Sequence, residues 1–208
     1  LAKDIGHILN EVKVGGSIGL PFSVTLDLNH LDQPLVKGSV QLSNNGVSYL
    51  DELRLDGVQG QISFTEASVQ FDAIKGQLFG GALRVTGGWG QSQSGLSFEG
   101  ELTAESLRKL SSAKTLNVFT GKTKYSGSVK PLSKSGFEAQ LSSSLEGIGI
   151  KLPAPLGKTA ARRLALSARW AYTPGQRGAE HALIVSFGDV LNGRFERQAA
   201  SRSPTFFN

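Results

Sequence analysis

The sequence predicts an all-β, β-dominated domain, built as an antiparallel meander whose strands have one apolar face. Three observations favour this class. Apolar and polar residues alternate in short runs along most of the chain, which is the two-residue period of a strand. The runs are separated by short connections rich in glycine, of which the 208 residues contain 26. Runs that adjoin in the sequence are expected to pair with each other.

The stretch from Gly57 to Gly88 shows this pattern most clearly. Its apolar positions, such as Ile62 and Phe71, alternate with glutamine, serine and aspartate. Because the connections at residues 65–67 and 80–81 are short, its three runs are predicted to be neighbouring antiparallel strands. The sheet is predicted to bend at its glycines, namely Gly60, Gly76 and Gly80-Gly81.

The N-terminal part is predicted to begin with a short amphipathic helix over Ala2–Val12, where apolar residues recur at helical spacing. The run Asn44-Asn45-Gly46 indicates a hairpin turn, since asparagine and glycine tolerate positive φ. Asn29–Pro34 predicts another turn. The strands expected around these turns are Pro21–Leu28, Val36–Leu42, Val47–Tyr49 and Leu53–Leu55.

A second helix is predicted at Thr103–Ser111, with Thr103 as its N-cap and Glu105 in its first turn. The run Ile148–Leu152 predicts a strand that Pro153 ends. We expect one domain over residues 1–197 and a frayed tail or linker over residues 198–208. Further strands are expected at Leu96–Leu102, Tyr125–Val129, Phe137–Leu141, Leu164–Trp170, Ala182–Phe187 and Val190–Phe195.

The composition excludes several classes of protein. Cysteine is absent, so the chain has neither disulfides nor cysteine-based zinc sites. No apolar run approaches the roughly 20 residues of a membrane span. The net charge of +5 is not gathered in a basic stripe interleaved with aromatic residues, so no nucleic-acid partner is expected. The chain begins with Leu1 rather than methionine, and we expect it to be a segment of a longer protein.

No constellation in the sequence predicts catalysis. His7, His30 and His181 lie far apart and lack the spacing of a metal-binding pair. Gly157-Lys158-Thr159 matches the end of a phosphate-binding loop, but Leu152 stands where the first glycine of that motif belongs. We therefore expect a protein that is not an enzyme, with no catalytic residues, no metal site and no cofactor.

Two stretches resemble a known family. Residues Leu145–Lys158, LEGIGIKLPAPLGK, are similar to a signature of the YhdP-type proteins of the AsmA-like superfamily, in which a strand ends in an LPAPLGK loop. Residues Val58–Leu83, where glycines punctuate the strands, are similar to the strand repeats of the same proteins. The resemblance extends over Val14–Arg197 and matches an internal part of a much longer protein.

The resemblance implies the periplasmic part of an inner-membrane-anchored protein of the Gram-negative envelope. Its strands would form a curled antiparallel sheet, a taco-like groove with an apolar interior. It would support phospholipid transport to the outer membrane and the integrity of that barrier. The partners would be phospholipid acyl chains and, through an anchor outside this chain, the inner membrane. The residues expected to line the groove are Phe22, Val24, Leu26, Val40, Leu42, Ile62, Phe64, Val69 and Phe71.

A second interpretation remains open: a β-sandwich-type binding or structural scaffold module without a lipid channel. In that case the same apolar residues fill a closed core. Trp89, Trp170 and Tyr172 would then either stack on a sugar or pack inside, and packing is favoured because Trp170 lies in an alternating run. In either case, a segment cut from a continuous sheet exposes strand edges, which predicts edge-to-edge self-association.

Overall fold

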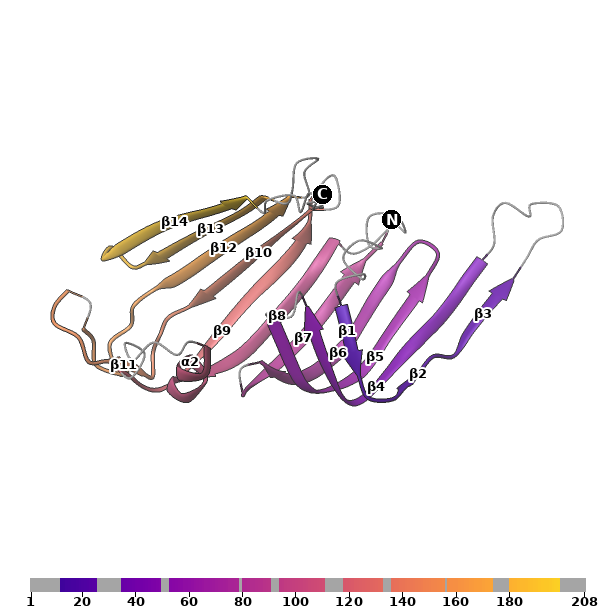
Figure 1. The fold of residues 1–208 in the computed structure, drawn as a ribbon, viewed down its shortest axis with the longest axis horizontal. Coiled ribbons are helices and arrows are strands. Elements are labelled where there is room, and N and C mark those ends of the chain that lie inside the picture. Colours follow the sequence, from indigo (N-terminus) through magenta and orange to yellow (C-terminus); the bar gives the residue numbers. More distant parts are fainter. Residues whose placement is uncertain are drawn as a thin grey trace, which may run out of the picture.

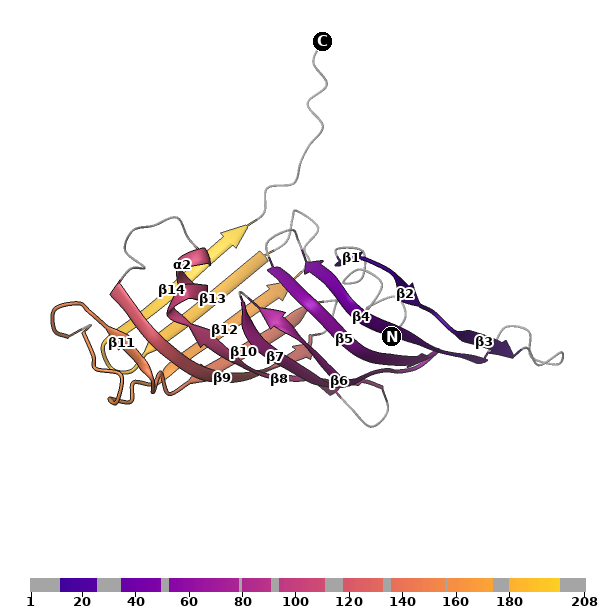
Figure 2. The ribbon, with the colours of Figure 1, turned by 90° about the horizontal axis from the view of Figure 1, so that it is seen from below.

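The computed structural model describes residues 12–25, 35–49, 53–78, 80–90, 94–110, 118–132, 136–155, 157–173 and 180–198. Within these ranges, fourteen strands form one open, curled antiparallel sheet (Figure 1). The predicted all-β, curled antiparallel meander is therefore confirmed. The strands cross the long axis of the molecule obliquely (Figure 2).

The order of strands in the sheet follows the sequence almost throughout. Neighbours run from β4 to β10 and then from β12 to β14, each pair antiparallel. The short β1, β2 and β3 all pair with β4, and β11 pairs with the start of β9. The bounds are β1 Val12–Gly15, β2 Ile18–Gly19, β3 Phe22–Thr25, β4 Leu35–Tyr49, β5 Leu53–Thr65, β6 Val69–Leu78, β7 Gly81–Trp89, β8 Ser94–Thr103, β9 Phe119–Pro131, β10 Phe137–Ser143, β11 Ile148–Ile150, β12 Leu166–Thr173, β13 Glu180–Phe187 and β14 Leu191–Gln198.

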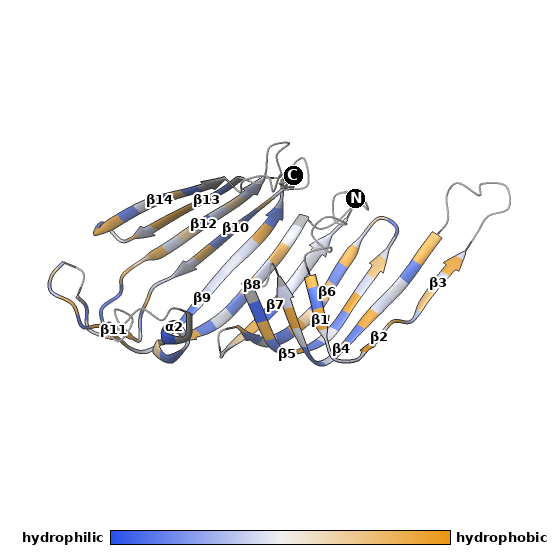
Figure 3. Cartoon of the chain, viewed as in Figure 1, coloured by the Kyte–Doolittle hydropathy of each residue, from blue (hydrophilic) through white to orange (hydrophobic). Residues whose placement is uncertain are grey.

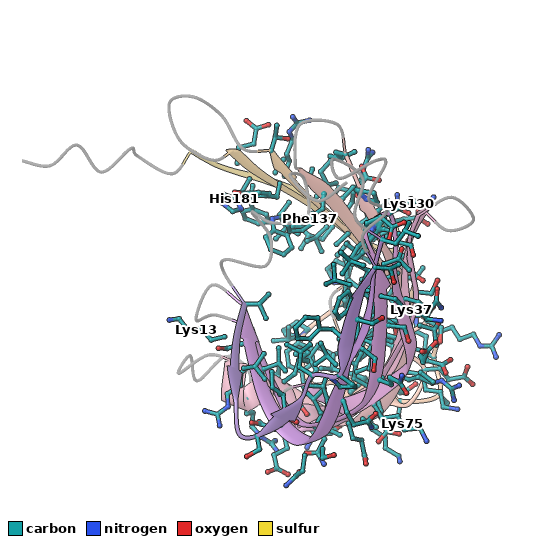
Figure 4. All side chains as sticks on the ribbon, turned by 90° about the vertical axis from the view of Figure 1, so that its right-hand side faces the viewer. Lys13, Lys37, Lys75, Lys130, Phe137 and His181 are labelled. Atoms are coloured by element: carbon teal, nitrogen blue, oxygen red, sulfur yellow. The ribbon has the colours of Figure 1, made fainter. Side chains whose placement is uncertain are left out.

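Directly paired residues share a face of the sheet, so the register sorts the side chains into rows. Figure 3 shows the resulting alternation of polar and apolar residues along the strands. Figure 4 shows Phe137 and His181 on the inner side of the curl and Lys37, Lys75 and Lys130 on the outer side. One inner row consists of Val40, Ile62, Phe71, Gly87, Leu96, Val129, Ala139, Trp170, Leu183 and Phe195. An adjacent outer row consists of Thr86, Ser97, Ser128, Gln140, Arg169, Ile184 and Arg194.

The curl coincides with bulges in three consecutive ladders. The register shifts between β4 and β5, between β5 and β6, and between β6 and β7. Gly60 has a φ of 131°, which a residue with a Cβ rarely adopts, and Gly76 lies opposite the bulge of β5. Each bulge bends its strand, so the aligned shifts curve the sheet around its apolar face. Gly80-Gly81, the third predicted glycine position, connects β6 to β7.

The predicted hairpin turn at Asn44-Asn45-Gly46 is wrong, because β4 continues through it. Asn44 has the positive φ that the sequence suggested, at 60°, but it serves a bulge rather than a turn. The reason is the side chain of Asn45, which is only 1% exposed. Its Nδ2 donates to the carbonyls of Gly15 and Ser17 at 3.0 and 2.9 Å, and its Oδ1 accepts from the amide of Ser43 at 2.7 Å.

The helix predicted at Thr103–Ser111 is confirmed as α2, Ala104–Leu110. Thr103 is its N-cap, since the threonine Oγ1 accepts a hydrogen bond of 3.0 Å from the amide of Ser106. The predicted N-terminal helix and the turn at Asn29–Pro34 fall almost wholly outside the described residues, apart from Val12, which begins β1. The strand predicted at Pro21–Leu28 is described only as β3.

The LPAPLGK loop folds back on β11 and is anchored by a buried lysine. The amide of Ile150 donates to the carbonyl of Lys158 at 2.8 Å, and the amide of Lys158 donates back at 3.0 Å. Inside the loop, Lys158 Nζ donates to the carbonyls of Leu145 and Ile148. Burial lowers the pKa of Lys158, the charge of Arg162 lowers it further, and Glu146 opposes both.

The hydrogen bonds of Asn45 predict that the Asn45→Ala variant is less stable by about 1–3 kcal/mol. The substitution removes three hydrogen bonds of a buried side chain, so two carbonyls and one amide lose this partner. Urea unfolding measures the change. The matched control is Asn44→Gly, whose backbone accepts the positive φ at no steric cost. Equal stability of the wild type and the Asn45→Ala variant would contradict the proposed role of this side chain.

The lowered pKa of Lys158 predicts a pH dependence with a definite sign. Between the folded pKa and the unfolded value of about 10.4, the unfolded chain binds more protons, so stability contributed by this residue rises with pH. The stability of the wild type minus that of Lys158→Met should therefore increase as pH rises toward that value, measured by urea unfolding. Lys151→Met, which removes an exposed lysine of the same loop, is the control. A difference that stays flat or falls with pH contradicts the assignment.

Candidate functional site: an apolar groove

The inner face of the sheet contains a groove of about 620 Å³ that spans seven neighbouring strands, from β5 to β12. Its walls are almost entirely aliphatic and aromatic. In the described residues no second sheet lies over it, because all their strands belong to one sheet. The lining residues are Leu55, Leu78, Leu83, Val85, Trp89, Leu96, Phe98, Leu102, Thr123, Tyr125, Val129, Pro131, Phe137, Ala139, Gln140, Leu141, Ser143, Leu145, Leu166, Ala168 and Trp170.

The groove continues into a smaller apolar cluster toward the N-terminal strands. Leu42, Val58 and Ile74 form the buried centre of this cluster. Leu55 and Val85 pack against the centre and also line the groove, so the two features share a wall. The inner face is therefore one apolar surface, filled by the cluster toward the N-terminal strands and hollow from β5 to β12.

The outer face over the same strands is polar. A shallow trough there is lined by hydroxyl, amide and charged side chains, among them Ser128, Gln140 and Ser167. Arg169 Nε donates to Glu138 Oε2 at 2.7 Å across β10 and β12. The hydrogen bonds from Gln140 and Arg169 lower the pKa of Glu138. Water can hydrogen-bond to the side chains of this outer face, whereas the inner face offers water almost no hydrogen-bonding groups.

Two polar atoms in the groove wall lack a hydrogen-bond partner among the described residues. They are the hydroxyl of Tyr125 and the indole Nε1 of Trp89. The Tyr125 ring lies against Gly100, where a Cβ would come within 2.5 Å of the phenol oxygen. Burial raises the pKa of Tyr125. The hydroxyls of Thr123 and Ser143, which also line the groove, are by contrast hydrogen-bonded to each other and to the carbonyl of Lys124.

The structure places the predicted lining residues in three different settings. Leu42 lies in the buried cluster, and Val40, Ile62 and Phe71 pack against it. Phe64 and Val69 are half-buried, directly paired across β5 and β6. Phe22 and Val24 are 66% and 52% exposed on β3, and Leu26 lies outside the described residues. Their part in lipid binding stays a prediction.

The hollow part of the groove involves residues that the sequence-based hypothesis did not name. Phe71 contacts the groove wall through a T-shaped ring contact of 5.7 Å with Trp89. Most of the wall belongs to β8, β9, β10 and β12, and β5, β6 and β7 complete it. Their alternation was visible in the sequence and identified the inward face. It gave no indication that the cavity lies in this half of the sheet.

The described residues contain no group of three or more histidine, aspartate or glutamate side chains arranged to hold a metal ion. None of their helices has the length and apolar character that crossing a bilayer requires.

Comparison with known protein families matches the YhdP protein family over residues 1–206. The chain belongs to the YhdP family. This is an AsmA-like family associated with the cell envelope and lipid transport, in agreement with the resemblance of the LPAPLGK loop. Neither the search of curated proteins nor the search of solved structures gave a match.

The buried hydroxyl of Tyr125 predicts that Tyr125→Phe leaves stability unchanged or raises it by about 1 kcal/mol. The substitution keeps the ring over Gly100 and removes a desolvated group that has no described partner. Thermal unfolding and urea unfolding both measure this. Tyr125→Leu is the control that removes the ring and should destabilise. A clear loss of stability in Tyr125→Phe would show that the hydroxyl has a partner.

Proposed function

We propose that this chain binds phospholipid acyl chains in the groove and shields them from water. It would act as a non-enzymatic segment of an inner-membrane-anchored envelope protein, in the periplasm of a Gram-negative cell. In this role it supports phospholipid transport to the outer membrane and barrier integrity. The observation that carries the proposal is the apolar groove that crosses seven strands and has no second layer over it in the described structure.

The groove is long enough to hold an acyl chain along its whole length. Seven strands spaced by about 4.8 Å make a track about 30 Å long, close to the hydrocarbon thickness of a bilayer, which is two chain lengths. Each buried methylene contributes about 0.8 kcal/mol, so about 10 of them gain about 8 kcal/mol before the entropy lost on binding is subtracted. Apolar burial is therefore the main favourable contribution to binding in this groove.

The chemistry of the groove floor favours movement of the chain rather than fixed recognition. Leu141, Val85 and Ala168 offer dispersion contacts and no directional hydrogen bond. A chain that shifts along such a wall exchanges one set of equivalent contacts for another. No reacting side chain is required, and the partner is the acyl chain itself.

The edge of the sheet at β14 is a second surface available for contacts. β14 ends the described sheet, and its Leu191 and Phe195 are 57% and 62% exposed. In the isolated segment, the same edge would pair with a second copy, which is self-association through strand edges.

Site-specific photo-crosslinking tests the proposal with neighbouring residues that face opposite ways. A photoreactive residue at Leu96 or Val129 lies in the groove, while one at Ser97 or Ser128 lies on the outer face of the same strands. We expect phospholipid adducts from the two groove positions in living bacteria, detected by mass spectrometry, and none from the two serine positions. Phe71 tests whether bound lipid reaches the N-terminal cluster.

The alternative, a scaffold without a lipid channel, predicts no lipid adduct at any position. Equal adducts on both faces would indicate nonspecific contact with membrane and would also contradict the proposal. Circular dichroism of each variant confirms that the β fold is kept, so a negative result refers to binding rather than to folding.

A further inference from the structure

Aromatic residues, most of which have a polar edge, gather along one border of the groove. Trp89 ends β7, Phe137 begins β10, and Tyr172 and His181 lie near the adjoining ends of β12 and β13. Phe137 pairs with Tyr172, and Tyr172 pairs with His181. Trp170 lies one inward-facing position further from this border than Tyr172. We call Trp89, Phe137, Trp170, Tyr172 and His181 the aromatic lip.

Ring contacts fix most of the aromatic lip in place. Phe137 stacks on Tyr172 with ring centroids 5.3 Å apart and meets Trp170 edge-on at 5.0 Å. His181 lies 5.2 Å from Tyr172 and is stacked on Trp170 at 6.1 Å. Trp170, Tyr172 and His181 are half-buried, so part of each residue packs against the protein and part remains accessible to solvent.

The floor of the groove has a different composition from its lip. One row deeper along the strands, directly paired residues are aliphatic, phenylalanine or glycine, with no polar atom on any side chain. This row consists of Ile74, Val85, Phe98, Gly127, Leu141, Ala168 and Val185. Tyr125 lies deeper still, but its hydroxyl is buried against Gly100 and faces no solvent. The hydroxyls of Thr123 and Ser143 also line the groove, but they bond to each other and to the carbonyl of Lys124. Half-buried rings with a polar edge are therefore found at the lip and not in the floor row.

Tryptophan, tyrosine and histidine have an apolar body and a polar edge, and such rings favour the level where hydrocarbon meets water. The Trp89 indole N–H is itself buried, so the half-buried rings of Trp170, Tyr172 and His181 are the ones that can present a polar edge to a ligand. A lipid whose ester carbonyls lay at this border would supply acceptors at that level, while its chains covered the floor.

We infer that the aromatic lip sets the orientation of the bound lipid, by holding its glycerol ester level at this border with the acyl chains across the groove floor. This inference rests on the proposed function. It goes further by stating which end of the lipid contacts the lip and which end contacts the floor. The head group then lies outside the lip in water, and the lipid enters and leaves past these rings.

Fluorescence quenching by brominated lipid measures this orientation directly. The chain has only two tryptophans, so Trp89→Phe leaves Trp170 as the sole lip reporter and Trp170→Phe leaves Trp89. A floor reporter is made by Phe98→Trp, or by Leu141→Trp as a second choice, in the chain with both native tryptophans replaced by phenylalanine. Each protein is incubated with vesicles of phosphatidylethanolamine brominated near the carboxyl end or near the methyl end of its chains. It is then separated from the vesicles by gel filtration, so that only carried lipid quenches.

We expect both lip reporters to lose more emission with bromine near the carboxyl end than with bromine near the methyl end. The floor reporter should show the opposite order. If the lip reporters are quenched more by bromine near the methyl end, or equally by both, the inferred orientation is wrong although lipid binding stands. If no reporter is quenched by either lipid, no lipid is carried and the proposed function fails as well.

Discussion

A sheet with one apolar face must keep that face from water, and this chain meets the requirement by curvature. In the described residues the strands form a single layer, so the curl takes the place of a second layer. The bulges of β4, β5 and β6 lie at neighbouring positions and bend the strands together. Where the bend is sharpest, Leu42, Val58 and Ile74 reach one another and form a buried cluster. Where it is gentler, the same face remains a groove.

Two buried polar side chains tie connecting segments to the sheet at separate places. Asn45 ties the β1–β2 connection to the bulge of β4, and Lys158 ties the LPAPLGK loop to the residues around β11. Both side chains bond to backbone carbonyls, which fixes the path of the chain without adding a group to the groove. Lys158 does not line the groove, whereas Asn45 is paired with Val58 and borders the buried cluster.

The separation of a smooth floor from an aromatic border gives the proposed lipid site two physical properties. An aliphatic floor offers the same contacts along its length, so it shields a chain without fixing its position. Packed rings with polar edges, such as Trp170 and Tyr172, provide a border where orientation is set. A groove of this kind lets a lipid shift along the floor, while the aromatic border sets which end of the lipid lies there.

Local periodicity in the sequence determined the fold class, the inward and outward faces, helix α2 with its Thr103 cap, and the glycine positions at the bends, because each depends on neighbouring residues alone. It did not distinguish a turn from a bulge at Asn44-Asn45-Gly46, since both use a positive φ. The carbonyls of Gly15 and Ser17 decided between them, and they lie about 30 positions away in the sequence. Alternation also did not distinguish the residues of the buried cluster from those that line the groove. Leu42 and Leu141 both face inward, but Leu42 is buried and Leu141 lines the groove, because the bend of the whole sheet differs between the two places. The sequence by itself determined which side chains face inward, and only the tertiary curvature decided what they enclose.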